Sequence, residues 1–314
     1  MSAGITVALL GSNEAGRHLG KKGTESDLTL YNLVREDHAA TLVEPTHFPE
    51  KFPPLLYALA MADRTLFFAA GLSREFAEMV ATADQFDTPT TFVLSAGIGE
   101  EELRRALKGT SLELSPTAAD DLPKLRETLE QWTVRPKLGP LRVRIDHAFP
   151  VKGVGAVALG IVREGTLRVH DRLQLYPTTH VVEVRSIQVH DREVTEAGGG
   201  SRVGVALKGT DAGELERGQT LAPEGTLEVG EQLEAAEFRL CRYYAGSLGI
   251  GSRLHVLVGL DLAPASVTTY ANAVVGLHTD RGVSYRPGDP IVLADLSVPK
   301  GPRVVGRGRV RRSS

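Results

Sequence analysis

Apolar and polar residues alternate in two different ways along this chain. Up to Trp132, short apolar runs are separated by stretches whose apolar residues recur every three or four positions. Short apolar runs predict buried strands, and the longer period predicts helices. We expect strands at residues 5–10, 40–43, 65–70, 90–94 and 111–114. We expect helices at residues 25–34, 52–62, 74–82, 100–107 and 118–132.

The regular alternation of strand and helix predicts an α/β first domain. Such an order is typical of a mainly parallel sheet with helices on both faces. In the last predicted helix, Leu122, Leu125, Leu129 and Trp132 form one apolar stripe. We expect the neighbouring aspartates, 120 and 121, to cap this helix. A linker with prolines and a glycine follows, so the first domain is predicted to cover residues 1–135.

Beyond Leu141 the pattern contains strands only. Alternating apolar residues between Gly, Asp and Pro turns predict a β-barrel from seven short strands, at residues 142–147, 155–162, 165–169, 172–176, 181–189, 193–197 and 202–207. A second all-β stretch runs from about 229 to 310. The predicted fold class is therefore α/β plus all-β, with barrel domains at residues 139–224 and 229–314.

Composition narrows the classes of function. With 42% hydrophobic and 24% charged residues, the chain is typical of a globular protein, and its formal charge of −3 confines any RNA contact to a local surface. The single cysteine, Cys241, rules out an internal disulfide or a cysteine zinc site and is expected to be buried. No apolar run is long enough to span a bilayer, and no basic leader opens the chain. We expect a cytoplasmic protein without membrane contact.

Candidate catalytic groups do not assemble into a pattern. The nine histidines are scattered without the paired spacing of metal ligands. No two carboxylates form an acid/base couple, and Glu100, Glu101 and Glu102 are expected to form the solvated first turn of a helix. We therefore predict no catalytic residues and no metal site.

The second domain carries the strongest resemblance to a known family. Residues 144–165 read RIDHAFPVKGVGAVALGIVREG, followed in order by VGVALKG at 203–209 and LERGQTL at 215–221. This series resembles the opening strands and two later signatures of domain 2 of the translation elongation factor Tu superfamily. Because glycines that permit positive φ or close strand approach are common in barrels, a generic Gly-rich barrel is the alternative.

The third domain resembles the same superfamily more loosely. Residues 248–259, LGIGSRLHVLVG, are similar to a stretch in the last barrel of the selenocysteine-specific factor. The segments PGD at 287–289 and RVVGRGRV at 303–310 resemble its closing strands. The resemblance implies a small P-loop NTPase-like (G-like) domain with a parallel sheet, followed by two β-barrels.

This resemblance makes the loop after the first strand the expected nucleotide site. Residues 11–18, GSNEAGRH, keep the spacing of Gly11 and Gly16, but Arg17 replaces the phosphate-binding lysine. His18 replaces the hydroxyl residue that binds magnesium, which prefers oxygen ligands. Glu14 adds negative charge where phosphates would lie.

A second alignment places the basic groups farther along the chain. Lys21, Lys22 and Thr24 would then lie at the start of the predicted helix, where anions bind readily. The longer spacing would no longer match a pyrophosphate. A basic loop that attracts other anions or contacts RNA, or a plain surface loop, remains open.

The other nucleotide motifs of the family are also altered. Residues 44–47, EPTH, stand for its D-x-x-G–H, so that Thr46 replaces a glycine and His47 falls near the place of the residue that orients the attacking water. Residues 95–98, SAGI, stand for the guanine-reading N-K-x-D and contain no carboxylate. With a helix at 25–34, the chain would have no room for a full switch I and its antiparallel strand.

Together these changes predict a degenerate site. Each charge-assisted contact contributes on the order of 1.5–3 kcal/mol, so losing three or four would remove most of a micromolar affinity of about 8 kcal/mol. We predict a pseudo-GTPase that needs no cofactor. A working GTPase with a remodelled site, binding GTP and Mg²⁺, is the alternative.

The end of the sequence is strongly basic. Six cations and no acidic residue occur in the last fifteen positions, and their alternation places several on one face of a strand: Lys300, Arg303, Arg307, Arg309, Arg311 and Arg312. Such a face suits phosphate contact, whereas a solvated edge strand protected by charge is the structural alternative.

The resemblance implies a function in translation. In related factors the G domain and barrels bind tRNA, so the expected partners are tRNA or the ribosome, or another translation factor, and not DNA. A protein–protein scaffold without RNA contact is a further alternative.

Overall fold

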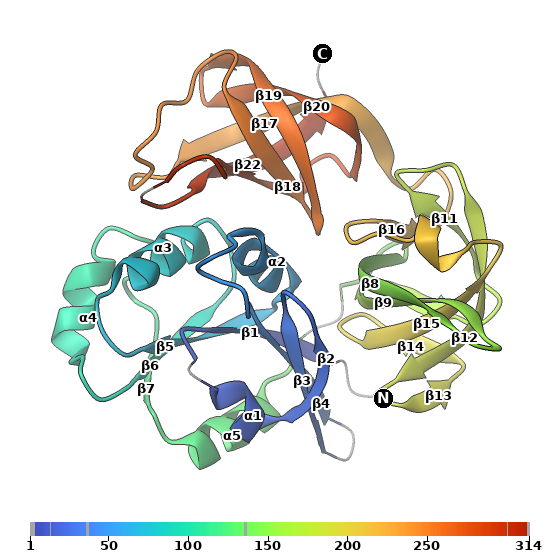
Figure 1. Ribbon diagram of the computed structural model, residues 1–314, viewed down its shortest axis with the longest axis horizontal. Coiled ribbons are helices and arrows are strands. Elements are labelled where there is room, and N and C mark those ends of the chain that lie inside the picture. The colour runs from blue at the N-terminus through green and yellow to red at the C-terminus, as the bar shows by residue number, and fades with distance from the viewer. Residues whose placement is uncertain (1–3, 13, 36–37, 135–136, 300, 313–314) are drawn as a thin grey trace. The chain divides into compact units, whose positions relative to one another are not determined.

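The computed structural model describes residues 4–12, 14–35, 38–134, 137–299 and 301–312 (Figure 1). By contacts between Cα atoms the chain forms two compact units. The first contains residues 1–134, 240–247 and 295–306, and the second contains residues 135–239, 248–294 and 307–314. The division into three domains at the boundaries given above stays a prediction.

A seven-stranded sheet organises the first unit. Its order is β2-β3-β4-β1-β5-β6-β7. Five strands are parallel: β1 (Ile5–Leu10), β4 (His38–Glu44), β5 (Arg64–Ala69), β6 (Thr90–Leu94) and β7 (Thr117–Ala119). All except β7 lie on the buried apolar runs that predicted strands, because helices cover both faces of the sheet. Two more, β2 (Lys21–Glu25) and β3 (Thr29–Arg35), add an antiparallel hairpin.

Five helices pack against this sheet (Figure 1): α1 (Ala15–Leu19), α2 (Pro53–Met61), α3 (Arg74–Ala83), α4 (Glu100–Leu107) and α5 (Leu122–Gln131). Leu9 of β1 packs in one core cluster with Leu19 of α1 and Leu129 of α5. Helices α2 and α3 contact each other, and α2 contacts β1. Asp121 caps α5 as predicted, since its carboxylate accepts a hydrogen bond from the Lys124 N–H.

Three predictions for this unit are wrong. Residues 25–34 do not form a helix: they form the β2–β3 turn and most of β3, whose full length pairs with β4. The antiparallel strand that was expected to be missing is therefore present. Residues 111–114 form turns instead of a strand, because Asp84 accepts hydrogen bonds from the N–H and hydroxyl of Ser111. The last helix begins at Leu122, since β7 occupies residues 117–119.

The strands of residues 142–222 form an antiparallel barrel. Its sheet order is β11-β16-β8-β9-β15-β12-β13, and an additional pairing of β11 with β12 closes the ring. The strands are β8 (Arg142–Val151), β9 (Gly155–Glu164), β11 (Arg172–Tyr176), β12 (Val181–Val189), β13 (Arg192–Val194), β15 (Arg202–Lys208) and β16 (Thr220–Ala222). The predicted strand at 193–197 is divided, because β14 (Glu196–Gly198) pairs with β10 (Thr166–Arg168).

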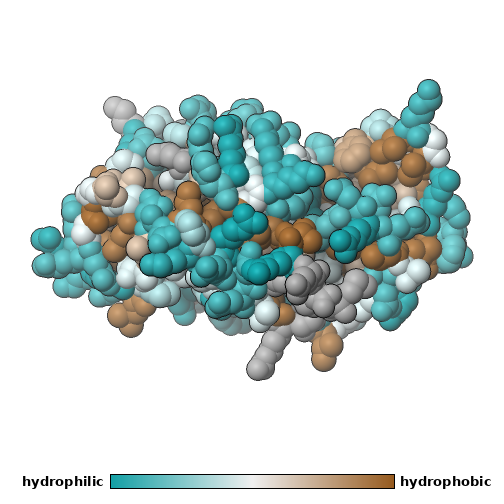
Figure 2. Space-filling view, turned by 90° about the horizontal axis from the view of Figure 1, so that it is seen from below, coloured by the Kyte–Doolittle hydropathy of each residue, from teal (hydrophilic) through white to brown (hydrophobic). Residues whose placement is uncertain are grey.

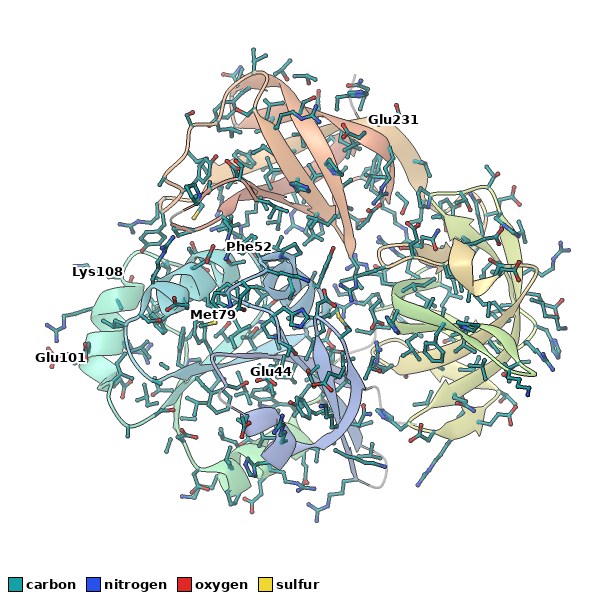
Figure 3. All side chains as sticks on the ribbon, viewed as in Figure 1. Glu44, Phe52, Met79, Glu101, Lys108 and Glu231 are labelled. Atoms are coloured by element: carbon teal, nitrogen blue, oxygen red, sulfur yellow. The ribbon has the colours of Figure 1, made fainter. Side chains whose placement is uncertain are left out.

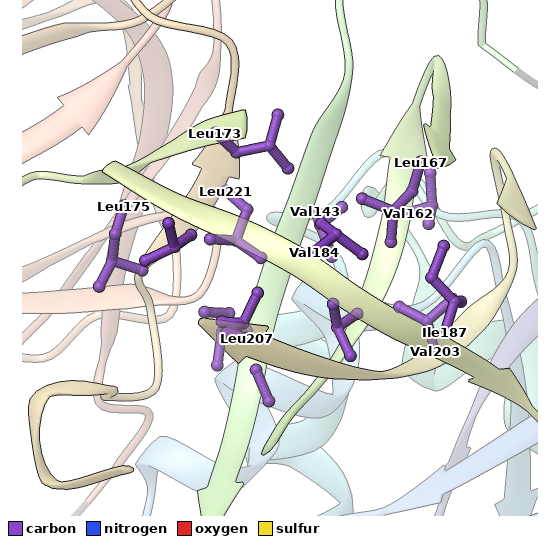
Figure 4. Packing of buried hydrophobic residues seen from close by; sticks show 14 of the residues in the cluster. Val143, Val162, Leu167, Leu173, Leu175, Val184, Ile187, Val203, Leu207 and Leu221 are labelled. Carbon is purple, nitrogen blue, oxygen red and sulfur yellow. The ribbon is translucent and has the colours of Figure 1, made fainter. Parts of the chain in front are cut away.

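Inward-facing residues of these strands fill the barrel (Figure 4). Val143, Val184, Leu207 and Leu221 belong to one buried cluster, although their strands lie far apart in the sequence. Burying alternate residues of every strand is what specifies a closed barrel of this size. The alternation along residues 142–221 therefore identified this core correctly.

A second closed barrel follows, in the order β17-β20-β19-β18-β21-β22. Its strands are β17 (Glu228–Leu240), β18 (Arg253–Val258), β19 (Asp261–Ala271), β20 (Val274–Tyr285), β21 (Pro290–Ala294) and β22 (Val304–Arg312). Gly288, in the turn before β21, has a φ of +88°. Asp289 accepts a hydrogen bond from the Arg286 N–H and forms a bidentate pair with Arg142 of β8.

The surface and the helices agree with an α/β-plus-barrel protein. Hydrophilic side chains cover most of the face in Figure 2, and hydrophobic ones gather in separate patches. Among the described helices, none is long and apolar enough to cross a membrane. Cys241 is buried, as expected.

Candidate functional site

A cavity of about 860 Å³ lies where the strands β4, β1 and β5 end. These strands are neighbours and parallel, so their carboxyl ends meet at one edge of the sheet, where open α/β sheets bind ligands. The loop after β1 was predicted to form this site. The lining residues come from strands, loops and helices at this edge, and among them are Gly11, Ser12, Glu14, Arg17, Tyr31, Glu44, Thr46, Phe68, Leu72, Glu75 and Met79.

The β1–α1 loop approaches its neighbours closely. Gly11 has a φ of +65°, and a Cβ added there would lie 2.5 Å from the carbonyl oxygen of Phe68. Both features require glycine. Helix α1, which follows the loop, has five residues, and Arg17 and His18 lie in its last turn. The described part of the loop thus keeps Gly11 in the close approach that requires glycine, and basic side chains follow in α1.

Tyr31 of β3 packs directly on this loop. A Cβ added at Gly16 would lie 2.3 Å from the Tyr31 ring, so the ring and the glycine backbone are in contact. The Tyr31 hydroxyl donates a hydrogen bond to Glu44 Oε2 at 3.0 Å, and the Ser12 hydroxyl donates one to Glu44 Oε1 at 2.6 Å. Sequence reasoning missed Tyr31 because it placed residues 25–34 on a helix. The apolar residues Leu28, Leu30 and Leu33 are spaced by two and by three positions, which does not decide between a helix and a strand.

The charges around the cavity are mainly negative. Four of its lining residues are glutamates, 14, 25, 44 and 75, whereas Arg17 is the only Lys or Arg among the described lining residues. The Arg17 guanidinium lies 3.2 Å from the Glu14 carboxylate. A hydrogen bond from Lys22 lowers the pKa of Glu25, and one from Ser73 lowers the pKa of Glu75, so both are ionised at neutral pH.

These residues do not fit GTP with magnesium. Phosphate oxygens would meet carboxylates that repel them, and the one arginine already has a carboxylate partner. Thr46, which stands for a glycine of the family, places its hydroxyl 2.5 Å from that of Thr29. At the guanine-reading position, Ser95 donates a hydrogen bond to Asp120, and Ile98 is buried. The degenerate nucleotide site stays a prediction.

The structure separates the predicted nucleotide-site residues into two groups. Gly11 and Arg17 line the cavity, and Gly16 lies beneath the Tyr31 ring. The others are not lining residues: Lys21, Lys22 and Thr24 belong to strand β2, and His47 is exposed in a turn, where its N–H donates to the Asp27 carbonyl. The second alignment was wrong, because it required a helix beginning at Thr24.

The predicted basic face is smaller than expected. Arg303 lies in the first unit, where its guanidinium donates to both carboxylate oxygens of Glu78, at 2.8 and 2.9 Å, and to the Pro49 carbonyl. It also stacks 4.8 Å from the Phe52 ring centroid. The Arg303 side chain is only 17% exposed and is paired with Glu78, so we leave Arg303 out of the RNA face proposed below.

The remaining arginines of the tail lie on β22. Arg309 and Arg311 are exposed and Arg307 is half-buried, while the intervening Val310 is buried, so the expected alternation is present. Arg311 Nη2 lies 4.0 Å from the Glu237 carboxylate. Lys300 lies outside the described residues, as does the side chain of Arg312.

The Tyr31 network makes stability depend on alkaline pH. Burial, followed by the neighbouring Glu44 carboxylate, raises the pKa of Tyr31 to about 12. An unfolded tyrosine ionises near pH 10, so between about pH 10 and about pH 12 the unfolded chain loses a proton that the folded chain keeps, and stability falls as pH rises. We expect the free energy of unfolding of wild type to decrease more steeply from about pH 10 to about pH 12 than that of Tyr31→Phe. Guanidinium chloride unfolding at each pH measures both slopes, and equal slopes would contradict the buried hydroxyl.

Comparisons with known proteins agree with this architecture. The family described as Elongation factor Tu domain 2 matches residues 155–222. The chain is 35% identical over 310 residues to the uncharacterized protein MJ0325 of Methanocaldococcus jannaschii, covering 98% of this chain and 99% of that protein. It is 26% identical over 275 residues to the selenocysteine-specific elongation factor of the same organism, of which it spans 58%.

A solved structure shows the same fold. The translation elongation factor SelB of Methanococcus maripaludis, in complex with the GTP analogue GppNHp, superimposes with a TM-score of 0.84 at 22% identity, covering 100% of this chain and 80% of that one. The sequence match to domain 2 and the superposition on SelB therefore agree with the observed order of a parallel-sheet unit followed by two closed barrels. This chain belongs to one family with MJ0325, within the translation elongation factor Tu superfamily and near its selenocysteine-specific elongation factor group.

Proposed function

We propose that this chain is a translation elongation factor-like protein that binds tRNA or the ribosome without binding or hydrolysing GTP. The family and the fold support the role in translation. The observation that carries the second part is the cavity at the ends of β4, β1 and β5, where glutamates and the Tyr31 ring stand in place of phosphate-binding groups. In this proposal, the chain keeps the scaffold of the superfamily and works without the nucleotide cycle.

Arginines on β22 supply the candidate RNA contact. Arg307, Arg309 and Arg311 alternate with inward-facing residues, so they lie on one side of the strand. Contacts between arginines and phosphates release counterions, which makes the affinity fall as salt rises. The proposal therefore predicts a salt-dependent RNA association that is indifferent to GTP.

A tRNA binding titration tests this function. We expect wild type to bind tRNA with an affinity that decreases with salt and is the same with and without GTP and Mg²⁺. The variant Arg307→Glu/Arg309→Glu/Arg311→Glu should bind at least about tenfold more weakly, because it reverses three charges of the face. Co-sedimentation with ribosomes, performed on the same proteins, distinguishes the two RNA partners.

A matched variant controls for net charge. Arg105→Glu/Lys108→Glu/Arg126→Glu reverses three exposed cations on α4, its end and α5, and should leave RNA association nearly unchanged. If GTP and Mg²⁺ strengthened RNA binding, the chain would be a working GTPase with a remodelled site. If neither tRNA nor ribosomes bound, the RNA-binding function would be wrong. The alternative would then be a protein–protein scaffold without RNA contact.

A further inference from the structure

The walls of the cavity at the ends of β4, β1 and β5 combine apolar and acidic groups. Leu9, Phe48, Phe68, Phe76 and Met79 supply apolar surface. Glutamates enter from two separate parts of the fold: Glu44 ends β4, and Glu75 lies in the first turn of α3. Figure 3 labels Glu44 and also Met79, which lies on α3 like Glu75. A cavity of about 860 Å³ with this mixture has the size and character of a small-molecule site.

Two of the four glutamates, Glu14 and Glu25, are paired with Arg17 and Lys22, whereas Glu44 and Glu75 accept hydrogen bonds from hydroxyl groups. Glu44 takes its hydrogen bonds from two neutral hydroxyls, those of Ser12 and Tyr31, which orient the carboxylate without neutralising its charge. Glu75 is likewise held by the Ser73 hydroxyl. A carboxylate has about four lone-pair sites, so both can accept further hydrogen bonds. The arginine of the cavity, by contrast, is paired with Glu14.

We propose that this cavity binds a small organic ammonium ion of the polyamine class, with ammonium groups at the carboxylates and its methylene chain against the apolar walls. The inference rests on the proposed function, because a cavity that held GTP would not be free for another ligand. A polyamine would then occupy the cavity where the family resemblance places a nucleotide.

Other ligand classes fit this lining less well. An anion would be repelled by the Glu44 and Glu75 carboxylates, which accept hydrogen bonds from neutral hydroxyls. A metal ion needs several ligands grouped around one point, and among the residues that the structure describes no three His, Cys, Asp or Glu side chains are grouped in that way. A polyamine matches both features, because N–H donors on a flexible apolar chain reach carboxylates that enter from different elements.

Calorimetric titration of the full chain with spermidine tests the proposal. We expect saturable one-to-one binding at moderate salt, and much weaker binding of butylamine, which carries a single ammonium group. Glu44→Gln and Glu75→Gln should each weaken spermidine binding about tenfold, since each removes one charge-assisted contact. Glu44→Gln changes the Ser12–Glu44–Tyr31 network and could disturb the fold. Glu75 is exposed in the first turn of a helix, so Glu75→Gln is expected to keep the fold and provides the independent test.

Glu101→Gln is the matched control. Glu101 lies in the first turn of α4, outside the cavity lining, and is labelled in Figure 3. It removes one negative charge from the same unit and should leave spermidine affinity unchanged. Equal loss in Glu101→Gln and the cavity variants, or the absence of saturation in wild type, would overturn the inference, because either shows only diffuse attraction to an acidic surface.

A titration with GTP and Mg²⁺ separates this inference from the proposed function. Without GTP binding and without spermidine binding, only the ammonium site is wrong. With tight GTP binding and no spermidine binding, both are wrong. With spermidine binding that GTP does not displace, both proposals stand.

Discussion

Arg202→Met is expected to lower the free energy of unfolding by about 3–5 kcal/mol, because it leaves a buried carboxylate without its charge partner. Arg202 forms a bidentate pair with Asp146 inside the first barrel, with N–O distances of 2.5 and 2.9 Å. The Asp146 side chain is 3% exposed, and that of Arg202 is 11% exposed. Guanidinium chloride unfolding followed by circular dichroism measures the loss.

Two further variants test whether the loss comes from the buried charge. Arg168→Met removes one side of an exposed pair with Glu196 in the same barrel and should cost less than about 1 kcal/mol. Asp146→Leu/Arg202→Met replaces both charges with apolar groups and should recover much of the loss, since no charge then stays buried alone. An Arg202→Met protein as stable as Arg168→Met would contradict the buried pair.

Arg303→Met should lower the free energy of unfolding by about 2–4 kcal/mol, for a related reason. It removes the two guanidinium N–H donors that the Glu78 carboxylate, 9% exposed, accepts from and leaves only the backbone N–H of residue 303. It also removes the stacking on Phe52. Trp132 belongs to the same unit, so its fluorescence reports this loss during denaturant unfolding.

The control for this change lies on the same strand region. Arg311→Met removes a cation that is 59% exposed and 4.0 Å from its carboxylate, so we expect a cost below about 1 kcal/mol. The two variants also differ in RNA binding: Arg303→Met should leave tRNA affinity almost unchanged, because its charge is directed to Glu78. A large loss of tRNA affinity in Arg303→Met, with stability retained, would return this residue to the RNA face.

Local patterns predicted most of the strands. The parallel strands β1, β4, β5 and β6 are apolar runs bounded by polar residues, and many barrel strands contain alternating apolar residues, so these strands carry a local signal. The β1–α1 loop was also placed correctly, because its glycine spacing follows a predicted strand. The position of the cavity could thus be predicted from the sequence.

The contents of the cavity could not be predicted in the same way. Residues 25–34 contain apolar residues at mixed spacings, and pairing with β4 decides in favour of a strand. This pairing brings Tyr31 onto Gly16 and Glu44, a contact that depends on three segments at once. Nothing in the local sequence around Gly16 shows that the ring of Tyr31 packs on this glycine.

The role of Arg303 was hidden for a different reason. A run of arginines at a strand face looks uniform in sequence, yet Arg303 meets a carboxylate 225 positions away, whereas Arg309 and Arg311 are exposed. Only tertiary structure distinguishes a half-buried cation that holds the fold, such as Arg303, from one whose side chain is exposed to solvent, such as Arg309.

The discontinuous first unit has a consequence for the order of events during synthesis. Glu78 lies on α3, and the guanidinium that it needs is added to the growing polypeptide 225 residues later. Until then, the nascent sheet carries an uncompensated carboxylate on its third helix, although the sheet strands themselves are complete by residue 119. The Glu78–Arg303 contact of the first unit can therefore form only after the barrel sequence has left the ribosome.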